Sequence, residues 1–238
     1  MTNRVAVAAA VALFIADCCT VAQQPPKPVF LSDPAAERIP NLDLLKKQVR
    51  AYHECTCTCG CLANDIDRQA DRAIAFLRQR AASRKPQEKL ALILDIDETT
   101  LSNYKEELDN DFAYIPATFD AWVVSAQAPA IGGTLRLYKE AQKLGVSIFF
   151  ITGRWEKERD ATERNLRAEG FDRWQELTMR SEEDGSETIG EFKAEIRRRI
   201  AAKGYTLALN VGDQWSDLKG KPEAEYNVKY PDPYYFIP

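Results

Sequence analysis

The chain has 238 residues, of which 45% are hydrophobic and 29% are charged, and its formal net charge is −4. This composition is ordinary for a soluble globular protein with one substantial core. A mildly acidic chain has no general attraction for nucleic acid polymers or anionic membranes, so any anionic substrate must be held by local groups.

The first 22 residues are predicted to form a secretory signal peptide. Arg4 precedes an apolar run, 5–16, that is too short to span a bilayer comfortably, and small residues at 20–22 suit cleavage. Residues 23–41 are rich in proline and polar side chains, which indicates an extended leader. We therefore expect an exported protein, periplasmic or extracellular.

A lipid anchor at Cys18 or Cys19 is the alternative fate of this segment, although Asp17 fits a lipobox poorly. A buried N-terminal helix is disfavoured because the apolar run lacks polar residues at helical spacing. Membrane association is expected only through such an anchor.

Four more cysteines alternate with other residues in "HECTCTCGC": Cys55, Cys57, Cys59 and Cys61. This spacing is unusual for zinc sites, in which paired ligands are two or more residues apart. In an oxidising compartment, local disulfides such as Cys55–Cys59 are one interpretation and unpaired structural cysteines are a second. Both are favoured over the third, a thiolate cluster for a soft metal. The pattern assigns no function.

The rest of the chain alternates between helical and strand patterns. Helices are predicted over 42–52 and 62–82, where apolar residues recur at spacings of three and four. Beyond them, strands at 90–94, 146–151, 176–179 and 205–211 are predicted to alternate with helices at 134–145, 156–171 and 188–204. The strands read as apolar runs, as in a parallel sheet covered on both faces. The pattern predicts an α/β fold, a Rossmann-like open parallel sheet with a small N-terminal helical appendage.

Polar residues follow three of the predicted strands. Asp95 and Asp97 follow the first, Thr152–Arg154 the second, and Asp213 and Asp217 the last. In open α/β sheets, ligands bind beyond the carboxyl ends of the strands. Carboxylates gathered there make an oxygen-lined site suited to Mg²⁺, whose charge would offset their repulsion.

These strand ends resemble the motifs of the haloacid dehalogenase (HAD) superfamily. "LDIDETTLSN" is similar to its first motif, "IFFITGR" to its second and "NVGDQWSDL" to its fourth, and Lys193, 20 residues before Asp213, fits the third. "FDAWV", "LRLYKEAQKLG", "ERNLRAEGF" and "KYPDPYYFIP" narrow the resemblance to the subfamily IIIB acid phosphatases. That branch includes plant vegetative storage proteins and bacterial class C-like phosphatases. The resemblance covers 42–238 and implies one HAD-like domain there, with only "HECTCTCGC" out of pattern.

The resemblance implies a role for each aspartate of the first motif. Asp95 would attack phosphorus and form an aspartyl-phosphate, and Asp97 would protonate the leaving oxygen and then activate water. Mg²⁺ would be held by the carboxylates of Asp95 and Asp213 and by the backbone carbonyl of Asp97.

It also implies that Thr152 and Lys193 bind the phosphoryl group, and that Asp217 orients Lys193 or a metal-bound water. For each of these three residues, a purely structural role stays open as an alternative. Thr152 could cap a turn, Lys193 could be a solvated flank of its helix, and Asp217 could be a helix N-cap. Arg154 is left undecided between a phosphate contact and a salt bridge.

The sequence also excludes other phosphatase classes. His53 is the only histidine, so neither a histidine phosphatase nor a histidine-rich binuclear centre is supported, and no P-loop motif is present. Only about 30 residues separate Asn103 from the helix near Thr134, which leaves no room for a large cap domain. We therefore expect the site to be covered only in part, by the helices of 42–82 and by the C-terminal tail. Aromatic residues are available to stack on a substrate: Tyr104, Phe112, Tyr114, Trp122, Trp215, Tyr234 and Tyr235.

We therefore expect an exported Mg²⁺-dependent acid phosphatase acting on small phosphomonoesters, with nucleoside 5′-monophosphates or a broad range of esters as substrates. A storage or binding protein of the same fold, or a phosphotransferase to alcohols, stays open as an alternative. The oligomeric state is not indicated.

Overall fold

The structure is a computed structural model that describes residues 39–57, 61–183 and 185–237. Cys18, Cys19 and Cys59, the signal peptide and most of the leader lie outside the described residues, so the interpretations that rest on them stay predictions. The chain divides into two units, 1–40 and 41–238, and the second contains the helices and strands described below.

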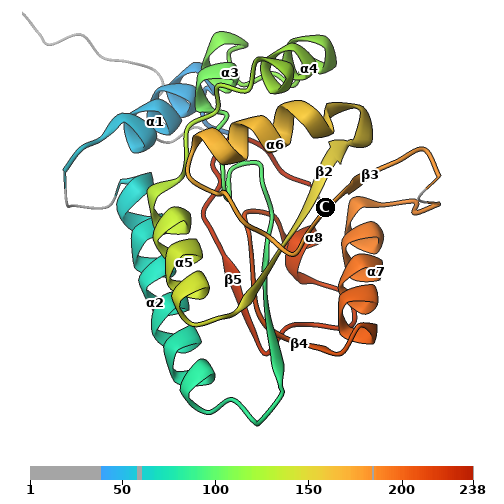
Figure 1. Cartoon of the computed structure of the whole chain (residues 1–238). Helices are drawn as coiled ribbons and strands as arrows, with labels where there is room; N and C mark the ends of the chain where they lie inside the picture. The colour runs from blue at the N-terminus through green and yellow to red at the C-terminus, as the bar shows by residue number, and fades with distance from the viewer. Residues whose placement is uncertain (1–38, 58–60, 184, 238) are drawn as a thin grey trace, which may run out of the picture. The chain divides into compact units, whose positions relative to one another are not determined.

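The second unit is built on a parallel sheet in the order β3-β2-β1-β4-β5 (Figure 1). Every neighbouring pair in this order is parallel. The fold class predicted from the sequence is confirmed, with one strand more than predicted at the β5 edge. The strands are β1 (Lys89–Leu94), β2 (Ser147–Trp155), β3 (Glu176–Arg180), β4 (Tyr205–Gly212) and β5 (Tyr226–Lys229).

Helices cover both faces of the sheet. On one face α2 and α5 pack against each other and against the strands, and α7 packs on the other face (Figure 1). The remaining helices gather towards the carboxyl ends of the strands. The helices are α1 (Leu42–Glu54), α2 (Leu62–Ala82), α3 (Tyr104–Asp109), α4 (Pro116–Ser125), α5 (Gly132–Lys143), α6 (Arg159–Ala168), α7 (Ile189–Ala202) and α8 (Trp215–Leu218).

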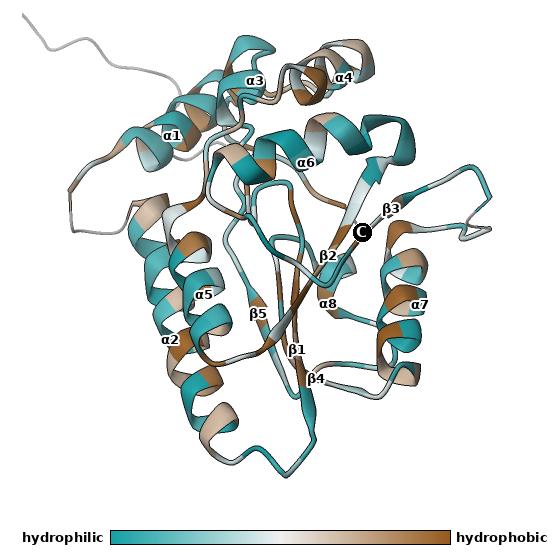
Figure 2. Cartoon of the chain, viewed as in Figure 1, coloured by the Kyte–Doolittle hydropathy of each residue, from teal (hydrophilic) through white to brown (hydrophobic). Residues whose placement is uncertain are grey.

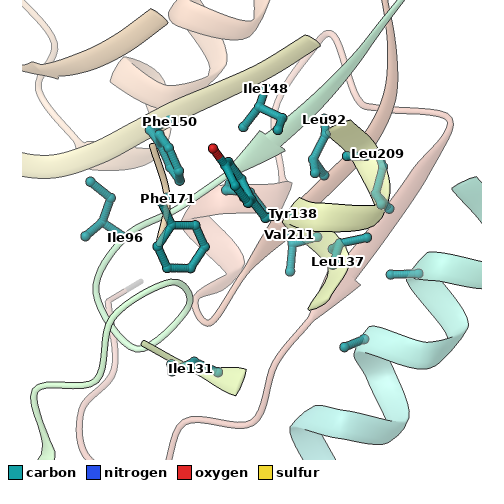
Figure 3. Close-up of a cluster of buried hydrophobic side chains, with 14 of the residues drawn as sticks. Leu92, Ile96, Ile131, Leu137, Tyr138, Ile148, Phe150, Phe171, Leu209 and Val211 are labelled. Carbon is teal, nitrogen blue, oxygen red and sulfur yellow. The ribbon is translucent and has the colours of Figure 1, made fainter. Parts of the chain in front are cut away.

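The alternation of side chains along β1 divides the core into two clusters. Leu92 and Leu94 face the α2–α5 side with Phe150 and Tyr138 (Figure 3), and Ile93 faces α7 with the rest of a smaller cluster. Burying one such side chain stabilises the fold by about 1.5–3 kcal/mol. The apolar strands and the polar outer faces of the helices separate clearly in Figure 2. The core thus holds the central strands rigidly beneath their polar carboxyl ends.

Two predicted boundaries differ from the structure. β2 does not stop at Ile151 but continues to Trp155, which pairs with Arg180 of β3. The helix predicted over 156–171 is instead a short 3₁₀ turn, η2 (Glu156–Glu158), followed by α6. Glu158 accepts a hydrogen bond from the backbone N–H of Trp155 at 2.8 Å, which fixes the turn.

The cysteine-rich segment corrects one prediction. Cys55 is a free thiol, as is Cys61, so the suggested Cys55–Cys59 disulfide is wrong. Cys57 is in a disulfide bond, and the sulfur atoms of Cys55, Cys57 and Cys61 lie within 4.8 Å of one another. Among the described residues, no helix combines the length and the apolar character that crossing a bilayer requires.

Candidate active site

The three strands with polar ends lie side by side at the centre of the sheet. β1 pairs with β2 on one side and with β4 on the other, so Asp95, Arg154 and Asp213 meet at one edge. The backbone N–H of Asp95 continues the β1–β4 ladder by donating to Val211 O at 3.1 Å. Asp95 and Asp213 are 6% and 1% exposed, so their carboxylates are almost fully withdrawn from water.

Lys193 lies between two of the buried carboxylates. A capping box between Thr188 and Glu191 begins α7, and the helix then carries Lys193 to the sheet edge. Its Nζ is 2.5 Å from Asp95 Oδ1 and also donates to Asp217 Oδ1. Burial alone would lower the pKa of Lys193, but the charges of Asp217 and Asp95 raise it above its usual value. Lys193 is therefore a buried cation paired with two aspartates within the site, not a solvated flank of its helix.

The carboxylate oxygens of Asp95, Asp213 and Asp217 lie within 4.8 Å of one another. Burial and the charges of neighbouring carboxylates raise the pKa values of Asp95 and Asp213 well above the usual range, although Lys193 opposes this. One ammonium does not balance three carboxylates, so the cluster is short of positive charge. A hard divalent cation such as Mg²⁺ fits such a set of oxygens.

Asp217 approaches β4 so closely that the strand must end in glycine. A Cβ at Gly212 would overlap the side chain of Asp217. Asp217 Oδ2 accepts a hydrogen bond from Gln214 N at 2.8 Å, which holds the α8 turn against the strand. Gln214 Nε2 in turn donates to Asp213 Oδ2 at 2.7 Å, and Thr99 Oγ1 donates to Asp213 Oδ1 at 3.0 Å.

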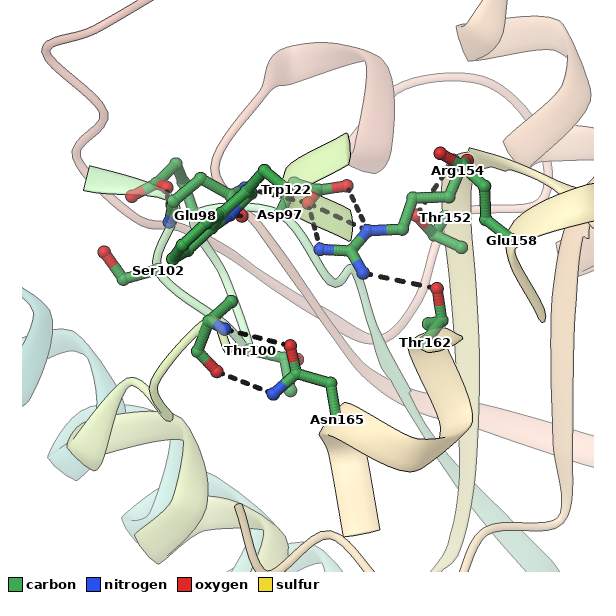
Figure 4. A network of polar contacts seen from close by, with 12 residues as sticks. Asp97, Glu98, Thr100, Ser102, Trp122, Thr152, Arg154, Glu158, Thr162 and Asn165 are labelled. Carbon is green, nitrogen blue, oxygen red and sulfur yellow. Dashed lines mark hydrogen bonds and ion pairs between the residues drawn. The ribbon is translucent and has the colours of Figure 1, made fainter. Parts of the chain in front are cut away.

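Asp97 forms an ion pair with Arg154 (Figure 4). Arg154 Nη2 is 2.7 Å and Nε 3.0 Å from Asp97 Oδ1, and Asn103 Nδ2 donates to the same oxygen at 2.8 Å. Burial favours the neutral acid, but the charge and hydrogen bonds of Arg154 hold the pKa of Asp97 below its usual value. The structure therefore settles the Arg154 alternatives: in this state it is salt-bridged.

The remaining predicted residue, Thr152, lies beneath the site. Its side chain is fully buried, and Oγ1 accepts a hydrogen bond from Arg154 N at 3.1 Å. Thr152 does not line the cavity described below, so its predicted phosphate contact stays a prediction.

A cavity of about 470 Å³ opens above the aspartates. Its walls come from the segment between β1 and the middle of α4, from the end of β2, from the start of α7, from 213–217 and from residues 235–237. The C-terminal residues thus line the cavity as expected, whereas α1 and α2, which were also expected to cover the site, contribute no wall residue. Tyr104 and Tyr234 pack with His53 instead, and Trp122 donates to Asn103 Oδ1 at 2.9 Å. Aromatic side chains in the cavity wall are Phe112, Tyr114, Phe119, Trp155, Tyr235 and Phe236.

Comparison with known proteins identifies the family. The family model described as HAD superfamily, subfamily IIIB (Acid phosphatase), matches residues 31–238. The chain belongs to this family. The resemblance carried by the four motifs is therefore confirmed.

Relatives with similar sequences come from plants. The chain is 39% identical over 148 residues to Acid phosphatase 1 of Solanum lycopersicum, covering 61% of this chain and 58% of that protein. It is 32% identical over 154 residues to Vegetative storage protein 1 of Arabidopsis thaliana, covering 61% of this chain and 55% of that protein. The chain thus spans less than two thirds of these relatives.

A solved structure shares the fold. The class C acid phosphatase from Bacillus anthracis superposes with a TM-score of 0.67 at 21% identity, covering 82% of this chain and 86% of that chain. At this identity the similarity supports the arrangement of strands and helices alone.

Sequence reasoning missed several polar residues of the site. Asn103 links Asp97 to Trp122, and Glu107 and Glu158 line the cavity. Asn103 stands inside the first motif and Trp122 inside "FDAWV", so the two quoted segments held a signal for this contact. Glu107 and Glu158 lie in stretches with no motif.

Proposed function

We propose that this protein is an exported, Mg²⁺-dependent acid phosphatase that hydrolyses small phosphomonoesters through an aspartyl-phosphate. The observation that carries this proposal is the buried Asp95–Lys193–Asp217 cluster beside Asp213, open to a cavity at the edge of the sheet. Membership of subfamily IIIB supports the reaction class, and the predicted signal peptide supports export.

Asp95 is the nucleophile in this proposal. Lys193 holds Oδ1, while no described residue donates a hydrogen bond to Oδ2, which is left as the attacking oxygen. The Oδ2–phosphorus bond forms as the bond from phosphorus to the leaving oxygen breaks. Lys193 remains within reach of the transferred group and offsets charge on its oxygens.

Asp97 is the general acid and then the general base. The leaving oxygen needs a proton from Asp97, and the pairing with Arg154 lowers the pKa of this carboxyl. The protonated form is therefore populated only at acidic pH. We therefore expect faster turnover under acidic conditions. Once the alcohol has left, the ionised Asp97 accepts a proton from the water that attacks the aspartyl-phosphate.

The oxygen donors fit a resident divalent cation. The carboxylates of Asp95 and Asp213 would hold it, with the backbone carbonyl of Asp97. When bound, Mg²⁺ would neutralise the clustered carboxylates and the phosphoryl oxygens. Asp217 and Asp95 both pair with Lys193, and Asp217 also accepts a hydrogen bond from Gln214 N. These contacts suit Asp217 to positioning Lys193.

The test is phosphate release from 4-nitrophenyl phosphate and from nucleoside 5′-monophosphates at pH 4 to 8, with Mg²⁺ or with EDTA. We expect metal-dependent turnover in the wild type and its loss in Asp95→Asn. The matched control Asp71→Asn, at an exposed position on α2, should keep the wild-type turnover. Turnover that survives Asp95→Asn would refute the nucleophile. Inactive wild type would point to a storage role, and product esters formed with added alcohols would reveal phosphotransfer.

A further inference from the structure

We propose that the outer part of the cavity selects phosphomonoesters whose alcohol carries a positive charge, foremost an alkylammonium group. This inference rests on the proposed function and concerns the half of the substrate that leaves with the alcohol. It follows from the charges in the cavity wall, from two carboxylates without full partners, and from the aromatic rings beside them.

The wall of the cavity is strongly acidic. Carboxylates outnumber cations by seven to two, and the two cations are Lys193 and Arg154. Lys193 is engaged with the buried aspartates, and Arg154 with Asp97. Within the described part of the wall, no cation is therefore left for a second anionic group. The seven carboxylates are Asp95, Asp97, Glu107, Asp120, Glu158, Asp213 and Asp217.

Two of these carboxylates lie outside the catalytic cluster and lack full partners. Glu158 is 3% exposed, and although Oε2 accepts from Trp155 N, Oε1 has no hydrogen-bond partner (Figure 4). Glu107 is 8% exposed, and no described residue donates to its carboxylate. Asp120, in contrast, is paired with Lys157 at 2.7 Å near the surface. A buried carboxylate without a partner costs free energy that an arriving cation would recover.

Aromatic rings share this part of the wall. Tyr114 and Phe119 have ring centroids 5.8 Å apart, and both line the cavity with Phe112 and Tyr235. Phe112 already has a guanidinium over its ring, that of Arg50 at 5.8 Å. Rings and carboxylates together form the environment that binds alkylammonium groups, because the ring faces and the acids attract the same charge.

A neutral aromatic alcohol would pack against the rings but would leave the carboxylates of Glu107 and Glu158 without a cationic partner. An alcohol with a carboxylate or a second phosphate would meet like charge with no free cation to offset it. The cavity of about 470 Å³ accommodates a phosphoryl group with a compact ammonium group. A cationic leaving alcohol is the class that satisfies all three features.

The test compares phosphocholine with 3,3-dimethylbutyl phosphate, which has nearly the same shape without the charge. At pH 8 we expect kcat/KM to favour phosphocholine at least 10-fold in the wild type. Burial and the charges of Glu106 and Asp97 raise the pKa of Glu107 to about 7, so this carboxylate is mostly ionised at pH 8. In the double variant Glu107→Gln/Glu158→Gln the ratio should fall towards one. Glu156→Gln, an exposed change next to Glu158, should preserve it.

Equal kcat/KM values in the wild type, or a preference that survives the double variant, would overturn the proposal. A second measurement separates this failure from failure of the proposed function. Calorimetric titration with tetramethylammonium reports the subsite without any turnover. If 4-nitrophenyl phosphate is not hydrolysed but tetramethylammonium binds the wild type at least 10-fold more tightly than the double variant, the cation site stands and the phosphatase assignment falls. No difference in binding would refute the cation site directly.

Discussion

Arg197 allows a direct test of what stabilises the backbone segment that carries Asp217. This side chain of α7 is fully buried, yet it contacts no carboxylate directly. Its guanidinium donates to carbonyl oxygens in and just after α8: Asp217 O at 2.6 Å, Pro222 O and Gly220 O at 3.0 Å, and Lys219 O. Arg197 thus fastens the backbone of the segment that carries Asp217 to α7, while Lys193 of the same helix holds the Asp217 side chain.

We expect Arg197→Met to destabilise the protein strongly. Methionine keeps most of the volume but removes the donors of four hydrogen bonds, and a typical intramolecular hydrogen bond contributes about 0.5–1.5 kcal/mol. Taking about 1 kcal/mol for each of the four gives a loss of about 4 kcal/mol. Proteins of this size have a free energy of unfolding of roughly 5–15 kcal/mol. The midpoint of thermal unfolding should fall by roughly 8–16 °C.

The assay is urea unfolding followed by tryptophan fluorescence, with Arg198→Met as the matched control. Arg198 is the next residue of α7, and its side chain is 61% exposed and paired with Glu195. We expect the control to change the free energy of unfolding by less than about 0.5 kcal/mol. Equal midpoints for the two variants would show that the carbonyl contacts contribute nothing, and would refute the reasoning.

Three further predictions concern charge. Lys193→Met leaves two buried carboxylates uncompensated, so we expect the free energy of unfolding in urea to fall by about 3–5 kcal/mol. The rate of phosphate release should fall at least about 100-fold. An unchanged rate would exclude a role of Lys193 in phosphoryl binding. Mg²⁺ at 100 times its Kd should add about 2.7 kcal/mol to the free energy of unfolding. Thermal unfolding with Mg²⁺ and with EDTA measures this gain. Asp213→Asn should abolish most of it. Hydrogen bonds from Arg80 lower the pKa of Glu88 to about 2, so this pair stabilises the fold above about pH 4.5 and is lost as the pH falls towards 2. Acid unfolding of Glu88→Gln should therefore be flatter in that window, and curves parallel to the wild type would contradict this.

The sequence predicts the sheet well because a strand buried on both faces leaves an apolar run. The runs at 90–94 and 146–151 mark β1 and β2 for this reason. β5 leaves no such mark, since Val228 is its only buried residue. α3 was equally hidden, because its buried residues, Glu106 and Glu107, are charged.

The sequence also anticipates which residues of the cluster converge. Asp95, Asp213 and Asp217 follow strands whose parallel order brings them to one edge, so their positions along the chain are informative. Lys193 lies within α7, and only the family resemblance placed it in the site. Their chemical roles stay predictions. The partner of Arg154 could not be foreseen, because an arginine at a strand end reaches a phosphate or a carboxylate equally well.

The cavity wall was predicted only in part. The C-terminal tail and the rings of Phe112, Tyr114 and Tyr235 were expected there, but the contact that positions the tail was not. Residues 235–237 reach it only through tertiary packing, in which Gln214 Oε1 accepts a hydrogen bond from Ile237 N at 3.0 Å. No periodic pattern in the sequence encodes such a contact.

The central position of β1 has a consequence for how this protein acquires its site. Asp95 and Asp213 are separated by 118 residues of chain, yet they become neighbours as soon as β4 docks beside β1. Parallel pairing over such a distance is slow, because the chain entropy of a long loop is lost before the contact is gained. Helices α2, α5 and α7 form locally and earlier. During refolding, circular dichroism should therefore recover before phosphate release does, and the delay between them would time the docking of β4.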